Sequence, residues 1–403
     1  MSHDNIPANL TVPGFLAGAV AAGIRYQGRP DLALILSEVP AAAAGVFTTN
    51  KVQAAPVLLS KAHLNRATVR AVVVNSGIAN ACTGEPGLEQ ARAMAHRTAR
   101  LVKCDPEEVL VASTGVIGRP LPLDVVTMHL PELVSSVSHE GWPDVARAIM
   151  TTDTVPKVHV VRGHVRNRPF TVLGVAKGAG MISPEMATLL AFVATDVAIT
   201  PAALQVMVRE ETERSFNRIT VDGDTSTNDT LFVLANGHAG NDAIAAPDSP
   251  EGGTVRRALG GVLLTLAKKI VADGEGATKF VEIRVTGAGS RGEALQAARV
   301  VANSPLVKTA LFGEDANWGR IVAALGRAGI DFDPGRVTIR FDEVKIVERG
   351  VSLGEEAEAL AREVLKKKDL TIVIDLHQGR SEDSVFTCDL SLDYVKINAH
   401  YTT

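Results

Sequence analysis

The sequence predicts a mixed α/β protein with two domains, and three observations carry that prediction. At 403 residues the chain is longer than the size at which a single hydrophobic core stops growing. Short apolar runs of strand length alternate with segments in which apolar residues have helical spacing. After Lys279 the strands and helices become shorter, which indicates a new domain. We therefore expect a main domain over 1–278 and a smaller C-terminal α/β domain over 279–403.

The strand predictions rest on short apolar runs that are bounded by turn-forming residues. The clearest are 69–74 and 189–193, which are continuous apolar runs typical of buried strands. The other predicted strands cover 32–36, 44–47, 109–112, 157–161, 170–175, 230–234, 281–285 and 370–376.

The helix predictions rest on periodicity and on start signals. Thr200 followed by Pro201 supplies an N-cap hydroxyl and then a proline at the first helical position, so a helix should run from there to about Ser215. The other predicted helices cover 88–102, 144–150, 249–272, 293–301 and 355–368.

Composition excludes several classes of function. A net charge of −4 gives no electrostatic reason to expect nucleic acid or an anionic membrane as a partner. The three cysteines are scattered, which fits a reducing compartment, and no lysine or arginine precedes Arg25, so the start of the chain lacks a signal-peptide flank. No apolar run approaches the ~20 residues of a membrane helix. We expect a cytoplasmic protein, and the ten histidines show no ligand spacing, so we predict no metal.

The chain is organised around the stretch 177–196. Its first part, 178–184, is rich in glycine and ends in proline, and the predicted strand 189–193 follows. Thr188 stands between them, at the mouth of a buried element. A threonine hydroxyl needs a neighbouring base to act as a nucleophile, and a cut before it would supply an α-amine with a pKa of roughly 7.7–8.0. These residues alone are more typical of a buried threonine with a satisfied hydroxyl.

The sequence resembles the bifunctional ornithine acetyltransferases (glutamate N-acetyltransferases) of arginine biosynthesis over most of its length. These enzymes cut themselves within a Met-Ala-Thr triplet, which here is Met186-Ala187-Thr188. One departure is Ile78, where a polar asparagine is expected. The other matching segments are Gly14-Phe-Leu-Ala17, Gly45-Val-Phe-Thr-Thr-Asn50, 54–57, 75–84, Thr151-Thr-Asp-Thr154, Ser215-Phe-Asn-Arg218, 222–229, 308–320 and 395–403.

The resemblance implies a self-cleaving ornithine acetyltransferase-like fold and a role for particular residues. Cleavage falls between Ala187 and Thr188, and Thr188 is then the nucleophile. Thr114 and Gly115 match the oxyanion hole, and the C-terminal tail 395–403 returns to the active site. The matching substrate-binding residues are Thr151 or Thr152 (between which we do not choose), Lys177, Thr188, Glu275, Asn398 and Thr403.

The implied reaction is a ping-pong transfer of acetyl from N2-acetylornithine to L-glutamate through an acetyl-enzyme. It needs no cofactor. The fragments 1–187 and 188–403 are expected to stay associated as a heterotetramer. Whether acetyl-CoA is also a donor stays open. The alternative function is that of a related self-cleaving amidase, which has the same scaffold but would pass the acyl group to water.

A different class of function is indicated by the segment from Gly287 to Gly292. It is a Gly-x-Gly-x-x-Gly pattern between a predicted strand and a predicted helix, with Glu314 where a ribose-binding acid would stand. The asparagine, serine and proline at 303–305 interrupt the unit before a second strand. We therefore rank dinucleotide binding below acetyl transfer and expect a turn and a helix cap here.

Overall fold

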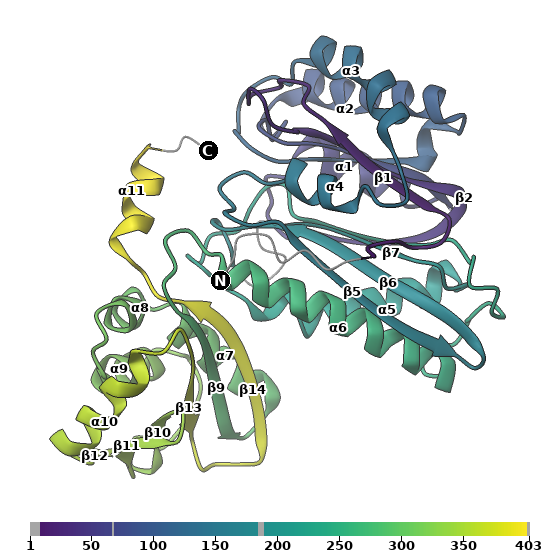
Figure 1. Ribbon diagram of the computed structural model, residues 1–403. Coiled ribbons are helices and arrows are strands. Elements are labelled where there is room, and N and C mark those ends of the chain that lie inside the picture. Colours follow the sequence, from purple (N-terminus) through teal and green to yellow (C-terminus); the bar gives the residue numbers. More distant parts are fainter. Residues whose placement is uncertain (1–8, 67, 184–188, 401–403) are drawn as a thin grey trace.

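The structure is a computed structural model that describes residues 9–66, 68–183 and 189–400. Two β-sheets, each with its own helices, lie side by side (Figure 1). The predicted mixed α/β class is therefore confirmed. In the described ranges, no helix is both long and apolar enough to span a membrane.

The larger sheet has eight strands in the order β4-β3-β2-β8-β7-β6-β5, with β1 paired to β2. Its strands are β1 (Phe15–Val20), β2 (Leu32–Phe47), β3 (Val69–Asn75), β4 (Val109–Ser113), β5 (Lys157–Val165), β6 (Arg168–Lys177), β7 (Leu190–Thr195) and β8 (Thr230–Ala235).

Strand β2 corrects one prediction. We predicted separate strands at 32–36 and 44–47, but the structure has one strand of 16 residues. Its first part pairs with β1 and β3, its second part pairs with β8, and the register shifts between Leu36 and Ala41. The exposed residues 38–40, which include Pro40, break the apolar pattern at this irregularity without ending the strand.

Alternating side chains divide the larger domain into four layers. On β3, Val72 and Val74 pack with Phe192 of β7 in an inner core, so the two halves of the sheet face each other. Ala71 and Val73 point to the other side, and Val193 lies in a third core. The helices of this domain are α1 (Ala55–His63), α2 (Gly84–Val102), α3 (Leu123–Ser136), α4 (Trp142–Ala148), α5 (Pro201–Glu213) and α6 (Pro250–Ala272).

Helices α2 and α3 cover one outer face of the folded sheet, and α5 and α6 cover the other (Figure 1). Helices α2 and α3 share a core with β3 and β4, whereas α5 and α6 share a core with β6, β7 and β8. Helix α4 places the fully buried Trp142 in the inner core. The ends of strands β4, β6 and β8 therefore have fixed positions.

Two predicted helix starts are confirmed by their caps. The Thr200 side chain accepts a hydrogen bond from the Ala203 N–H at the start of α5. At the start of α6, the Ser249 hydroxyl accepts one from the Gly252 N–H at 3.0 Å. These caps satisfy backbone donors that have no partner inside the helix.

Replacing Ser249 with alanine should therefore destabilise the protein without changing its chemistry. Loss of one N-cap costs about 1 kcal/mol, so we expect the melting temperature to fall by a few degrees. Thermal unfolding followed by circular dichroism checks this, with Ser249→Asp, which keeps an acceptor, as the control. A melting temperature that falls equally in both variants would contradict the capping role.

The smaller sheet begins at Phe280 and has six strands in the order β12-β11-β10-β13-β9-β14. Its strands are β9 (Phe280–Ala288), β10 (Thr338–Phe341), β11 (Val344–Glu348), β12 (Val351–Ser352), β13 (Asp369–Asp375) and β14 (Ser381–Cys388). The helices of this part are α7 (Arg291–Ala302), α8 (Pro305–Phe312), α9 (Trp318–Gly326), α10 (Glu355–Leu365) and α11 (Leu392–His400).

Strand β14 joins the two parts of the molecule. Val385 faces the core of the smaller sheet, whereas Phe386 and Cys388 pack into the core beneath α6. The chain then continues into α11, which rises beside the larger part (Figure 1). The division of the chain at 278/279 stays a proposal.

Candidate functional site

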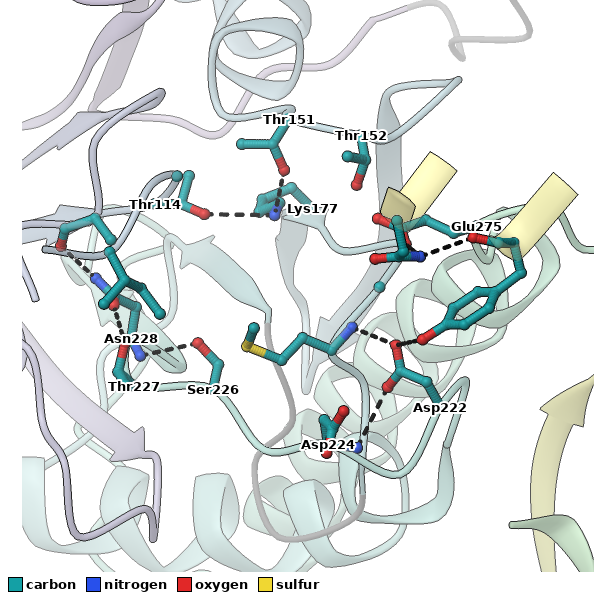
Figure 2. A pocket seen from close by; sticks show the side chains of 17 residues that line it. Thr114, Thr151, Thr152, Lys177, Asp222, Asp224, Ser226, Thr227, Asn228 and Glu275 are labelled. Carbon is teal, nitrogen blue, oxygen red and sulfur yellow. Dashed lines mark hydrogen bonds between the residues drawn. The ribbon is translucent and has the colours of Figure 1, made fainter. Parts of the chain in front are cut away.

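A polar cavity of about 210 Å³ opens where several segments of the chain meet (Figure 2). Residues after β4, after α4, at the end of β6, before β8 and after α6 contribute to it, together with α11. The lining residues are Ala79, Thr114, Gly115, Ile117, Thr151, Thr152, Lys177, Gly180, Met181, Asp222, Asp224, Ser226, Thr227, Asn228, Glu275, Tyr394 and Asn398.

Thr114 and Gly115 follow directly after β4 and line the cavity together. Gly115 has φ +132, and a Cβ atom there would lie 2.2 Å from the backbone carbon of Gly77. Only glycine fits this position. In the described part of the chain, the Gly115 N–H has no hydrogen-bond acceptor, so it is free to donate to a ligand.

Lys177 is the last residue of β6 and is almost fully buried, with 3% of its surface exposed. Its Nζ donates to Thr151 Oγ1 at 2.9 Å and to Thr114 Oγ1 at 3.4 Å (Figure 2). Burial lowers the pKa of Lys177 because it disfavours the charged form, while Asp153 acts in the opposite direction. Of the two threonines between which the sequence did not decide, Thr151 contacts Lys177, and both line the cavity.

Behind Lys177 lies a buried network of charges. The Asp153 carboxylate accepts hydrogen bonds from Lys157 Nζ and from the Gly178 N–H, both at 2.7 Å, and Lys157 also pairs with Asp273 at 2.6 Å. Burial alone would raise the pKa of Asp153, but the two lysines hold it well below its usual range. Asp153 is therefore ionised, and it supplies negative charge 4.0 Å from Lys177.

Glu275 lies on the far side of the cavity, in the loop after α6. Its Oε2 accepts a hydrogen bond from Asn398 Nδ2 of α11 at 2.7 Å, and its N–H donates to the Ala179 oxygen at 2.9 Å. Gly180 makes room for the carboxylate, since a Cβ there would lie 2.5 Å from Glu275 Oε1. The structure thus brings Glu275 and Asn398 together at the cavity.

Asp222 holds the same side of the cavity. Its carboxylate accepts from the N–H groups of Met181 and Ile182 at 2.6 and 2.8 Å, and the Tyr394 hydroxyl donates to it at 3.3 Å. Burial raises the pKa of Asp222, and burial together with Asp222 raises that of Tyr394. These contacts fasten α11 to the loop that follows β6.

Three predicted residues, Ala187, Thr188 and Thr403, lie outside the described residues. The neighbouring Leu189 is described, and its N–H donates to Asp229 Oδ1 at 3.0 Å. Asp229 is buried, its Oδ2 accepts no hydrogen bond from the described residues, and burial raises its pKa well above the usual range. Asp229 directly follows Asn228, which lines the cavity.

Sequence reasoning assigned no role to several residues of this site. The string 222–229 matches the family pattern, and its density of acidic, amide and hydroxyl groups is the signal that points to these residues. In the structure, Asn228 Nδ2 bridges the carbonyl oxygens of Ala79 and Ser113 at 2.7 and 2.8 Å, which fixes the segment after β4. Ile78, the departure from the family pattern, packs in the apolar core with α2 and α3.

The glycine-rich segment from Gly287 to Gly292 does connect a strand, β9, to a helix, α7. However, the start of α7 is occupied by the protein itself, because Ser290 and Glu293 form a reciprocal capping box there. A Cβ atom at Gly287 would lie 2.2 Å from Asp375 Oδ1, so this glycine serves close packing against β13. The segment acts as the turn and helix cap that we ranked first.

Comparisons with known proteins agree with the family resemblance seen in the sequence. The ArgJ family profile matches residues 16–403. The arginine biosynthesis bifunctional protein ArgJ of Geobacter sulfurreducens is 52% identical over 395 residues, which cover 98% of this chain and 100% of that protein. The ArgJ protein of Desulfotalea psychrophila is 50% identical over 392 residues, covering 97% of this chain and 100% of that protein. A crystal structure of ArgJ from Bacillus halodurans is 42% identical with a TM-score of 0.50, and the match covers 52% of this chain and 98% of that chain.

Proposed function

The chain belongs to the ArgJ family, and we propose that its cavity transfers the acetyl group of N2-acetylornithine to L-glutamate. The family match confirms the resemblance noted in the sequence and makes the protein an acyltransferase of arginine biosynthesis. The observation that carries the proposal is the meeting of Thr114, Gly115, Lys177 and Glu275 in one cavity.

The charges in the cavity suit a ligand with a cationic end. Glu275, Asp222 and Asp224 lie on one side, and within the described residues none of them forms a salt bridge. Lys177 lies on the opposite side, with its charge offset by Asp153 (Figure 2). An ammonium group such as that of the ornithine side chain would find its counter-charge among the three carboxylates.

The chemistry that we propose uses Thr188 twice. Its hydroxyl first attacks the carbonyl of Ala187, so the C–N bond between these residues breaks and Ala187 becomes an ester on the Thr188 oxygen. Water then hydrolyses this ester, which leaves a carboxylate on Ala187 and frees both the hydroxyl and the α-amine of Thr188. The hydroxyl then attacks the acetyl carbonyl of N2-acetylornithine, the α-amine takes the hydroxyl proton, and ornithine leaves with a proton on its nitrogen. The amine of glutamate attacks the resulting ester and restores the free threonine. The Thr114 hydroxyl and the Gly115 N–H stabilise the negative oxygen in each step.

One observation supports a cut between residues 187 and 188, and a second supports continued association of the two fragments. The solved ArgJ chain of Bacillus halodurans matches 52% of this chain with 98% of its own length, so it is about half as long, as a fragment of such a cut would be. In this chain, β6 lies before the proposed cut and pairs with β7 after it, and β2 pairs with β8 in the same way. The fragments 1–187 and 188–403 would therefore share one sheet and stay associated, and we propose a heterotetramer of two such pairs.

The direct test combines an intact mass with an assay. Purified protein should give two masses, for 1–187 and 188–403, and should form N-acetylglutamate from N2-acetylornithine and glutamate. One mass of the whole chain together with full activity would refute the cleavage mechanism. Adding acetyl-CoA in place of acetylornithine decides whether it is a second donor.

The alternative of a self-cleaving amidase makes a different prediction about the acceptor. An amidase would release acetate at a rate that does not depend on glutamate. A transferase would form acetylglutamate in preference to acetate, because the amine of a bound glutamate reaches the acetyl-enzyme before water does. The ratio of the two products therefore separates these activities.

Replacing Glu275 with glutamine should weaken the ornithine half-reaction more than the glutamate half-reaction. The amide keeps the shape of the side chain but removes the charge that we assign to ornithine, so we expect KM for acetylornithine to rise about tenfold or more. Glu282→Gln, which removes a carboxylate of β9 that pairs with Arg284, is the matched control. Equal effects of Glu275→Gln on both half-reactions would show that Glu275 is structural.

A further inference from the structure

Two hydroxyl groups of the cavity share one buried ammonium group. Lys177 Nζ lies 2.9 Å from Thr151 Oγ1 and 3.4 Å from Thr114 Oγ1 (Figure 2). Thr151 lies between α4 and β5 and Thr114 follows β4, so Lys177 links separate segments at the end of β6. Neither threonine hydroxyl has another hydrogen-bond partner among the described residues.

The donor inventory of these groups fixes the direction of both hydrogen bonds. A lysine ammonium has three protons and no lone pair, so it can only donate. Each threonine oxygen must therefore accept, and each hydroxyl proton is left for another acceptor. Because Thr114 lines the cavity, its proton is available to a ligand there.

We propose that Lys177 is a positioning residue that holds the Thr114 hydroxyl as a donor directed into the cavity, toward the oxygen of the reacting acyl group. The inference rests on the proposed function, in which Thr114 and Gly115 receive that oxygen. It assigns Lys177 a role that acts through Thr114. A hydroxyl that already accepts from a cation is also the stronger donor, since hydrogen bonds in a chain polarise one another.

The surroundings of Lys177 hold its ammonium group in a fixed position. Only 4% of its side chain is exposed, and its ammonium group contacts both threonine hydroxyls. Burial lowers the pKa of Lys177, whereas the ionised Asp153, which stands 4.0 Å away, favours the charged form. Asp153 is itself held by Lys157 at 2.7 Å, and Lys157 by Asp273 at 2.6 Å, so this counter-charge is fixed in place.

A double-mutant cycle tests the inference. Lys177→Met should lower kcat roughly 10- to 100-fold and leave KM for both substrates nearly unchanged, because only the transition state loses support. In a Thr114→Val background, which has no hydroxyl to orient, the same replacement should lower kcat by less than about threefold. Rates are expressed per cleaved chain, as counted by intact mass. If Lys177→Met does not fold, Lys177→Gln takes its place in the cycle.

Lys269→Met is the control, because Lys269 is half-buried and donates to the Val158 oxygen at 2.7 Å, outside the cavity. It should keep wild-type kcat. An equal loss of kcat in both backgrounds, or a rise in KM with kcat unchanged, would overturn the inference while the proposed function stands. A wild-type protein that transfers no acetyl group would instead refute the proposed function.

Discussion

Replacing Thr188 with alanine is expected to give an uncut chain of 403 residues that transfers no acetyl group. One oxygen atom is assigned both the attack on the Ala187 carbonyl and the attack on the acetyl carbonyl, so its removal abolishes both. If Thr188 were only a buried threonine, the same change would cost about 1 kcal/mol of stability and nothing else. Intact mass and an acetylglutamate assay on the purified variant distinguish the two.

Two companion variants complete this test. Thr188→Ser keeps a hydroxyl and should keep part of both the cleavage and the transfer. Thr195→Ala removes a buried threonine from the other end of β7 and should stay cut and active. A cut and active Thr188→Ala protein would end the assignment of Thr188.

The second large effect is expected from Thr114→Ala. It should lower kcat by roughly 10- to 10³-fold with little change in folding, because one donor to the developing negative oxygen is lost. Thr114→Ser should recover a large part of the rate. The hydroxyl of the neighbouring Ser113 donates to Asn75 Oδ1 at 2.6 Å. Ser113→Ala is therefore the matched control, and it should lower stability but leave kcat unchanged. Wild-type kcat in Thr114→Ala would exclude an oxyanion role.

Much of the fold could be predicted from local sequence signals. The helix predicted over 249–272 is α6, Pro250–Ala272, because its cap and its end are both local features. Helix α3, Leu123–Ser136, was not predicted, since Pro131 inside it interrupts the helical pattern. Helices α8 and α9 have only 8 and 9 residues, and their stability comes from packing in the smaller core.

The candidate site was less predictable from local signals. Thr114, Lys177 and Glu275 were found through the family resemblance, because a single threonine or glutamate in a loop carries no local signal of its function. The contact between Lys157 and Asp273 joins residues 116 positions apart, and only the folded chain brings them together. The same holds for the contact of Asp222 with Tyr394, which lies 172 positions further along.

The pairing of strands across the proposed cut determines the order in which a molecule folds and is cleaved. Strands on both sides of the proposed cut hydrogen-bond to one another, β6 with β7 and β2 with β8. A newly made chain would therefore have to fold first, as one covalent unit, and be cut afterwards. Once cut and then unfolded, the two pieces could regain the structure only by a bimolecular encounter, so recovery would depend on concentration. A cleaved molecule that unfolds in dilute solution would thus rarely refold, because its two fragments would have to meet again.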